Sequence, residues 1–212
     1  FSGHIQGVKS VNTVVKTAIK LKIKYLTLFT FSKENWARPK KEVTMLMDLF
    51  ISTIENNTNH FLKNEIKILT IGNIEDLPKT CQKLLQDIIE KTKKNAKMTL
   101  VLALSYSGRS EIIHAINMII KNQKKNHIIT EKLVNNHLQT SEIPDPELLI
   151  RTSGEKRISN FLLWQIAYAE LYFSEKKWPD FDAEELYMAI FEYQKRERRF
   201  GKTTEQIENE KF

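Results

Sequence analysis

Four arginines follow apolar segments of the sequence that we expect to form strands. Arg38 lies in the stretch SKENWARP, Arg109 in SYSGR, and Arg151 and Arg157 in RTSGEKRIS. The planar guanidinium group binds carboxylate or phosphate through two parallel hydrogen bonds. A single such arginine would be explained by a surface ion pair. Four of them after strands, where open α/β sheets bind their ligands, predict a phosphate or diphosphate site.

Other polar side chains have both a chemical and a structural explanation. His4 could donate to a phosphate or carry a proton, although a single histidine is more often structural. Glu155 and Glu170 could bind Mg²⁺, which prefers oxygen ligands, although an isolated glutamate is usually solvated or paired. Residues 196–201 (RERRFG) fit either the end of a helix or a basic clamp on an anion.

The net charge of +7 raises the question of nucleic-acid binding. Only seven of the 33 basic residues are arginines, and the other 26 are lysines spread along the chain. Dispersed lysine does not form the basic stripe that binds a duplex. We therefore expect no nucleic-acid partner. A nucleic-acid-binding module is a remote alternative function that rests on the net charge alone.

Several motifs are missing from the sequence. It has no P-loop, no dinucleotide-binding GxGxxG, no GxSxG elbow and no pair of histidines at metal-binding spacing. Cys81 is the single cysteine, so no internal disulfide can form and a reducing compartment is expected. The sequence has neither an apolar run of about 18 residues nor a signal peptide. These features predict a cytoplasmic protein.

Helical and strand patterns alternate along the chain, which predicts a single α/β domain with a mainly parallel sheet covered by helices on both faces. Such a sheet usually begins with a strand, whereas this chain begins with a helix, so the first strand is expected upstream of Phe1. The apolar helix faces are core by default, or the lining of a lipid tunnel. The predicted helices are residues 7–21, a long helix beginning at Pro39, 78–94, 110–121, 130–137, 161–169 and 183–199, and the predicted strands are 25–31, 66–71, 98–104, 148–151 and 171–173.

Several longer stretches resemble the cis-prenyltransferase family, and most closely its bacterial undecaprenyl diphosphate synthases. They are GHIQGVKS, FSKENWARP, SYSGRSEI and, above all, IRTSGEKRISNFLLWQIAYAELYF followed by WPDF. The resemblance implies a cis-prenyltransferase domain over residues 1–201 and a polar tail over residues 202–212. It also implies a six-stranded, mainly parallel sheet.

The same resemblance implies a function. The enzyme would condense isopentenyl diphosphate onto an allylic diphosphate, farnesyl diphosphate, and build a long-chain polyprenyl diphosphate such as undecaprenyl diphosphate. It would act as a homodimer with Mg²⁺, in the cytoplasm, with peripheral membrane contact for product release. A noncatalytic subunit of the same family is the alternative, although such subunits typically lose several of the catalytic positions that this sequence retains.

Site residues follow by resemblance, position by position. Asn35 would help to remove the proton during condensation, and Glu170 would bind the magnesium ion. His4 would lie near the allylic diphosphate, and Arg199 and Gly201 would belong to an element that reaches the neighbouring subunit. The remaining substrate-binding positions would be Ser32, Lys33, Glu34, Trp36, Arg38, Arg151, Arg157, Ile158 and Ser159.

Two positions and one segment depart from the family pattern. Lys156 stands where many bacterial members have histidine, and Ser105 where many have asparagine. The family's DGNGRWA segment, whose aspartate binds magnesium and the allylic diphosphate, is expected upstream of Phe1.

Overall fold

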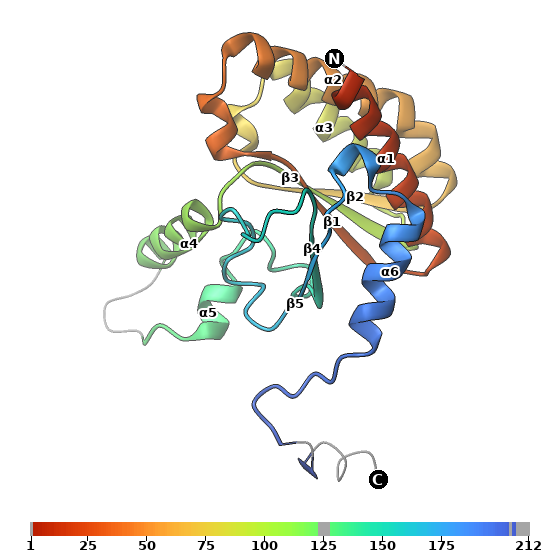
Figure 1. Ribbon diagram of the computed structural model, residues 1–212. Helices are drawn as coiled ribbons and strands as arrows, with labels where there is room; N and C mark the ends of the chain where they lie inside the picture. Colours follow the sequence, from red (N-terminus) through yellow and green to blue (C-terminus); the bar gives the residue numbers. More distant parts are fainter. Residues whose placement is uncertain (1, 123–127, 204, 207–212) are drawn as a thin grey trace.

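Three parallel strands form the larger of two sheets in the computed structural model, which describes residues 2–122, 128–203 and 205–206, with side chains from Gln6 onward (Figure 1). The strands are β1 (Tyr25–Ser32), β2 (Ile66–Ile71) and β3 (Met98–Tyr106), in the order β1-β3-β2. Leu28 of β1 and Thr70 of β2 both pair with Leu102 of β3. The central strand β3 is almost entirely buried, as its apolar sequence requires.

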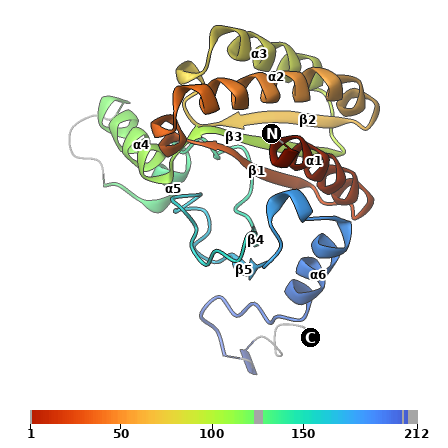
Figure 2. The same cartoon turned by 45° about the horizontal axis from the view of Figure 1, so that its top comes forward.

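Three amphipathic helices cover one face of this sheet: α1 (Ser2–Lys20), α2 (Lys40–Lys63) and α3 (Lys79–Thr92) (Figure 2). Alternate residues of β3 point towards them, because successive side chains of a strand point to opposite faces. Leu100 and Leu102 therefore share a core with Met47 of α2 and Leu85 of α3.

The opposite face of the sheet is covered by irregular segments. Val101 and Ala103 of β3 pack with Leu162, Phe161 and Ile143. The ring of Phe161 stacks on Phe29 of β1 with centroids 4.4 Å apart. The prediction that helices cover both faces of the sheet is therefore wrong for the described residues, because turns and loops pack on this face.

The smaller sheet contains β4 (Leu148–Arg151) and β5 (Glu170–Phe173), which are parallel and pair only with each other among the described strands. The 3₁₀ helix η3 (Trp178–Asp180) and helix α6 (Ala183–Gln194) follow β5. Leu186 of α6 packs with Val14 of α1 and Ile150 of β4, which connects the smaller sheet to the helical layer. Helices α4 (Gly108–Asn122) and α5 (Glu131–Asn135) pack together beside the sheets (Figure 1).

All five strands predicted within the chain are confirmed, as is the single α/β domain. The six-stranded sheet is wrong for the described residues, because no backbone hydrogen bonds join β1 to β4. The helix predicted over residues 161–169 is a series of turns instead. A positive φ at Asn160 and Leu162 interrupts any helix there. Helix α6 ends at Gln194, five residues earlier than predicted.

No helix in the described part of the chain is both long enough and apolar enough to cross a bilayer.

Candidate functional site

The carboxyl ends of β1 and β3 lie side by side, since Ser32 pairs with Tyr106. The 3₁₀ helix η1 (Lys33–Ala37) begins directly after β1. Asn35 Oδ1 accepts a hydrogen bond from the backbone N–H of Ser32 at 3.0 Å, which fixes the first turn. Lys33 Nζ lies 3.3 Å from Ser110 Oγ at the start of α4. The loop that carries the predicted catalytic residue is thus held across the ends of both strands.

Trp36 is held by a chain of hydrogen bonds that crosses β3. Its Nε1 donates to Ser105 Oγ at 2.9 Å, and that hydroxyl donates to Asp76 Oδ2 at 2.6 Å. The Asp76 carboxylate also accepts from Asn73 Nδ2. Ser105 is buried and has a φ of +47°, a region that non-glycine residues rarely adopt. Strained backbone of this kind concentrates at functional sites.

Asn160 joins three loops of the site. Its Nδ2 lies 2.7 Å from Glu34 Oε1 and 2.8 Å from Ser107 Oγ. Its Oδ1 accepts from the backbone N–H of Arg109 at 3.0 Å, and its backbone carbonyl accepts from Gly108 N at 2.8 Å. The segment after β4 is therefore connected directly to the ends of β1 and β3.

The bond to Asn160 also changes the acidity of Glu34. Burial acts to raise the pKa of this carboxyl, but the hydrogen bonds from Asn160 and from its own backbone N–H lower it below its usual value on balance. Glu34 is therefore a carboxylate at neutral pH, and acts as a hydrogen-bond acceptor that orders the loop.

Arg151 is the last residue of β4, and its side chain has a buried hydrogen-bond donor. Its Nε is buried and has no hydrogen-bond partner among the described residues. Buried donors are nearly always paired, so an unpaired guanidinium nitrogen is suited to an anionic ligand. Arg151 Nε is the one such atom among the predicted site residues that the structure describes, and Arg198 Nε outside that set is buried and without a partner in the same way.

The other three arginines predicted at the strand ends, Arg38, Arg109 and Arg157, are exposed, and two of them are already paired with acids. Arg157 forms an ion pair with Glu155, and Arg38 lies 2.9 Å from Glu42. Exposed ion pairs contribute little to stability, so either guanidinium group can exchange its partner for a phosphate at low cost.

Ile158 and Ser159 lie between Arg157 and Asn160, and both are half-buried. Ser159 has a φ of +49° and Asn160 a φ of +62°. Two consecutive left-handed residues turn the chain back towards β3, and asparagine tolerates this region better than most residues.

Glu170, the predicted magnesium ligand, lies at the other end of the β4–β5 pair from Arg151. It begins β5 and pairs with Leu148, whereas Arg151 pairs with Phe173. Its Oε2 is 2.9 Å from Arg196 Nη1. Among the described residues no three histidine, cysteine or acidic side chains are grouped to hold a metal ion.

The C-terminal element lies apart from the arginine loop. Arg199 Nε is 2.9 Å from Glu197 Oε2, and Gly201 adopts a φ of +82° in open space. The neighbouring Arg198 lies over the ring of Phe200 and is 2.9 Å from Glu147. His4 lies in α1, but its side chain is outside the described residues.

Sequence reasoning missed Asn160 and Asp76, the two residues that connect the loops. Asn160 stands next to the predicted Ser159, and its neighbours in space come from segments up to 126 residues away. An asparagine within a serine- and arginine-rich loop is a weak signal, since such residues also form turns by themselves.

Comparison with known proteins adds to this geometry. The family model for undecaprenyl diphosphate synthase matches residues 1–201. The chain belongs to the undecaprenyl diphosphate synthase family. Curated relatives of this family member include the isoprenyl transferase of Chlorobaculum tepidum, which is 50% identical over 97% of this chain and 79% of the relative. That of Clostridium perfringens is 47% identical over 94% of this chain and 80% of the relative.

Two crystal structures resemble this member of the family. One is a probable undecaprenyl diphosphate synthase from Campylobacter jejuni, with a TM-score of 0.84 and 36% identity, covering 93% of this chain and 92% of that one. The other is lavandulyl diphosphate synthase from Lavandula x intermedia in complex with dimethylallyl diphosphate, with a TM-score of 0.90 and 32% identity, covering 95% of this chain and 89% of that one. Fold and family thus agree with the predicted prenyltransferase.

Proposed function

We propose that the protein condenses isopentenyl diphosphate onto an allylic diphosphate, with farnesyl diphosphate as the primer and a long-chain polyprenyl diphosphate such as undecaprenyl diphosphate as the product. The observation that carries this proposal is the buried Nε of Arg151, which has no partner among the described residues and precedes the loop that Asn160 connects to the ends of β1 and β3. The isoprenyl transferase relatives support the same class of reaction.

The reaction has two parts that different residues serve. The bond from the allylic C1 to its diphosphate oxygen breaks and inorganic diphosphate leaves. C1 then bonds to C4 of isopentenyl diphosphate, whose C2 loses a proton. Arg151, Arg157 and Ser159 would hold the diphosphate of isopentenyl diphosphate, and Asn35 would help to remove the proton. The ordered turn of η1 places the Asn35 side chain at the ends of β1 and β3.

A requirement for Mg²⁺ is part of the proposal. Mg²⁺ keeps several waters and is commonly bound through one or two carboxylates plus substrate phosphates. The substrate diphosphates would therefore supply part of its ligands, together with water and one or two carboxylates. Glu170 could contribute a carboxylate oxygen, although its Oε2 also lies 2.9 Å from Arg196 Nη1.

We further propose a homodimer in which Arg199 and Gly201 serve the neighbouring site, together with peripheral membrane contact when the apolar product leaves. Twofold dimers are the commonest assembly of soluble enzymes. The noncatalytic alternative is less favoured, because Asn35, Arg151 and Arg157 are all retained.

Incubation of the protein with farnesyl diphosphate and labelled isopentenyl diphosphate tests the function, with and without a chelator in excess of Mg²⁺. We expect labelled polyprenyl diphosphate only when Mg²⁺ is present, with chain length given by mass spectrometry. Failure to extend any allylic diphosphate, by a folded protein supplied with Mg²⁺, would overturn the proposal.

A further inference from the structure

Residues 174–176 leave β5 and lie directly against the loop that carries Arg151. Three backbone hydrogen bonds join the two segments: Ser174 N donates to Arg151 O at 2.8 Å, Ser153 N to Lys176 O at 2.7 Å, and Gly154 N to Ser174 O at 2.9 Å. The position of residues 151–154 therefore depends on the position of residues 174–176.

The two segments fit closely as well as being hydrogen-bonded. A Cβ atom placed on Gly154, whose φ is +66°, would lie 2.6 Å from Glu175 Oε2. Ser174 is 2% exposed, so its hydroxyl must find a partner within the protein. The three backbone hydrogen bonds therefore restrict movement of one segment relative to the other.

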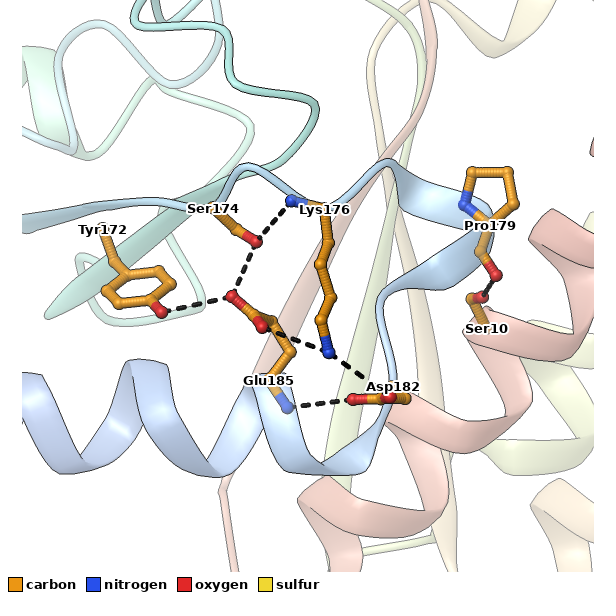
Figure 3. A network of polar contacts seen from close by, with 7 residues as sticks. All are labelled: Ser10, Tyr172, Ser174, Lys176, Pro179, Asp182 and Glu185. Atoms are coloured by element: carbon orange, nitrogen blue, oxygen red, sulfur yellow. Dashed lines mark hydrogen bonds and ion pairs between the residues drawn. The ribbon is translucent and has the colours of Figure 1, made fainter.

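Glu185 of α6 holds residues 174–176 from the side away from the loop (Figure 3). Its Oε1 accepts from Ser174 Oγ at 2.7 Å and from Tyr172 OH at 3.2 Å. Its Oε2 lies 3.4 Å from Lys176 Nζ. The Glu185 side chain is only 15% exposed, so these contacts are not replaced easily by water.

The start of α6 is fixed by the same group of residues. Asp182 Oδ1 accepts from the backbone N–H of Glu185 at 3.0 Å, which caps the helix. Its Oδ2 lies 3.5 Å from Lys176 Nζ, so the lysine contacts both carboxylates (Figure 3). The helix terminus, the lysine and the end of β5 therefore form one polar cluster.

We infer that Glu185 is a positioning residue for the diphosphate-binding loop. It holds Ser174 and Lys176, whose backbone groups in turn hold Arg151, Ser153 and Gly154. Glu185 acts through these segments and not on the ligand itself. The identity of the ligand as a diphosphate rests on the proposed function, whereas the connection from Glu185 to the loop does not.

Binding of inorganic diphosphate by calorimetry, together with steady-state kinetics, tests this inference on the full chain. Glu185→Ala should weaken diphosphate binding and raise the KM for isopentenyl diphosphate on the order of tenfold, because a misplaced binding group loses its alignment. The value of kcat should change less. Glu184→Ala, which removes an exposed carboxylate from the same helical turn, is the matched control and should bind as the wild type does.

A double variant distinguishes positioning from general destabilisation. If Glu185 acts through Arg151, then Glu185→Ala should add little to the loss already caused by Arg151→Ala. Glu185→Gln keeps an acceptor for Ser174 and loses only the charge opposite Lys176, so it should show a smaller effect and stay folded. Diphosphate binding that is unchanged in both Glu185 variants, or fully additive losses in the double variant, would overturn the inference.

The outcomes also separate this inference from the proposed function. If the wild type binds diphosphate but transfers no prenyl group, and Glu185→Ala weakens that binding, the proposed function fails and the inference stands. If the wild type is an active enzyme and Glu185→Ala leaves diphosphate binding intact, the inference alone fails. A folded wild type that binds no diphosphate overturns both.

Discussion

Asn160 Nδ2 donates a hydrogen bond to Glu34 Oε1 at 2.7 Å, across 126 residues of sequence. The same amide nitrogen reaches Ser107, so one side chain fixes the loops that follow β1, β3 and β4. The predicted catalytic Asn35 lies next to Glu34. The loop that contains Asn35 and the loop that contains Arg157 are thus joined by a residue that carries no charge.

The first prediction concerns this bridge. Asn160→Gly removes the side chain but tolerates the φ of +62°, whereas Asn160→Ala also strains the backbone. Both variants should lower kcat/KM on the order of tenfold or more, because the two loops lose their alignment. The free energy of unfolding of the alanine variant, measured in urea, should be about 1 kcal/mol lower than that of the glycine variant. Wild-type activity of the glycine variant would show that the bridge is dispensable.

A second prediction concerns Arg151 and Arg157. Replacement of either with alanine removes a charge-assisted contact that can be bidentate, so the KM for isopentenyl diphosphate should rise at least about tenfold with the fold intact. Arg151→Lys should be intermediate, because it keeps the charge and loses the planar group. Lys93→Ala is the control, since Lys93 pairs with Glu90 at the end of α3, before β3 begins. Unchanged kinetics in both arginine variants would contradict the assignment.

A third prediction separates two roles of Asn35. If its amide helps to remove the proton, Asn35→Ala should bind both substrates almost normally and turn over on the order of 100-fold more slowly. Asn35→Asp keeps an oxygen that can accept from the Ser32 N–H. Should the aspartate variant retain full turnover, capping of η1 is the main role of this position. Should only KM change in the alanine variant, Asn35 positions the substrate.

The polar cluster at the start of α6 makes stability depend on pH. The hydrogen bond from Ser174 lowers the pKa of Glu185 although burial opposes it, and the backbone N–H of Glu185 lowers the pKa of Asp182. A group whose pKa is lower in the folded state stabilises the protein above its unfolded pKa. For Glu185 this stabilisation is lost as the pH falls below its usual value of 4.5 and through the folded pKa.

Urea unfolding at pH 6 and pH 3 measures this effect. Glu185→Gln, which cannot ionise, should lose less free energy of unfolding between the two pH values than the wild type does. Identical acid-induced losses in the two proteins would mean that Glu185 does not contribute to the pH dependence.

Local sequence patterns are sufficient to predict where the strands lie in the chain. They are not sufficient to predict how the strands pair in the sheet. Residues 66–71 and 148–151 were predicted with their observed bounds, because short β-branched and apolar runs between polar turns are strong signals. The order β1-β3-β2 depends on pairings between distant segments, which no local pattern contains. The apolar stretch 161–169 looked helical because burial on the sheet requires apolar residues whatever the backbone conformation.

The site shows the same division between local and long-range information. The arginines and Asn35 are recognisable from residue type and from their place after strands. Asn160, Asp76 and Glu185 act through partners in other segments, so their importance appears only in three dimensions. Ser105 illustrates the point, because its hydroxyl connects Trp36 to Asp76 and its left-handed backbone cannot be deduced from a serine.

The last prediction concerns the proposed dimer and the element that contains Arg199 and Gly201. Glycine at a φ of +82° in open space allows its backbone N–H to approach an anion closely. Assayed well below the KM for isopentenyl diphosphate, a variant truncated before Arg199 and an Arg151→Ala variant should each retain about a tenth or less of the wild-type activity. If the element crosses to the neighbouring subunit, one site in each mixed dimer has both an intact arginine and an intact C-terminal element.

Activity under the same assay conditions should therefore rise when the two impaired variants are mixed and allowed to exchange subunits, to about one quarter of the wild-type level at equal concentrations. This value follows because half of the dimers are mixed and each has one complete site. If each element serves its own subunit, every mixed dimer has one site without the arginine and one without the element. No recovery, with exchange demonstrated by differently tagged subunits, would confine the element to its own site.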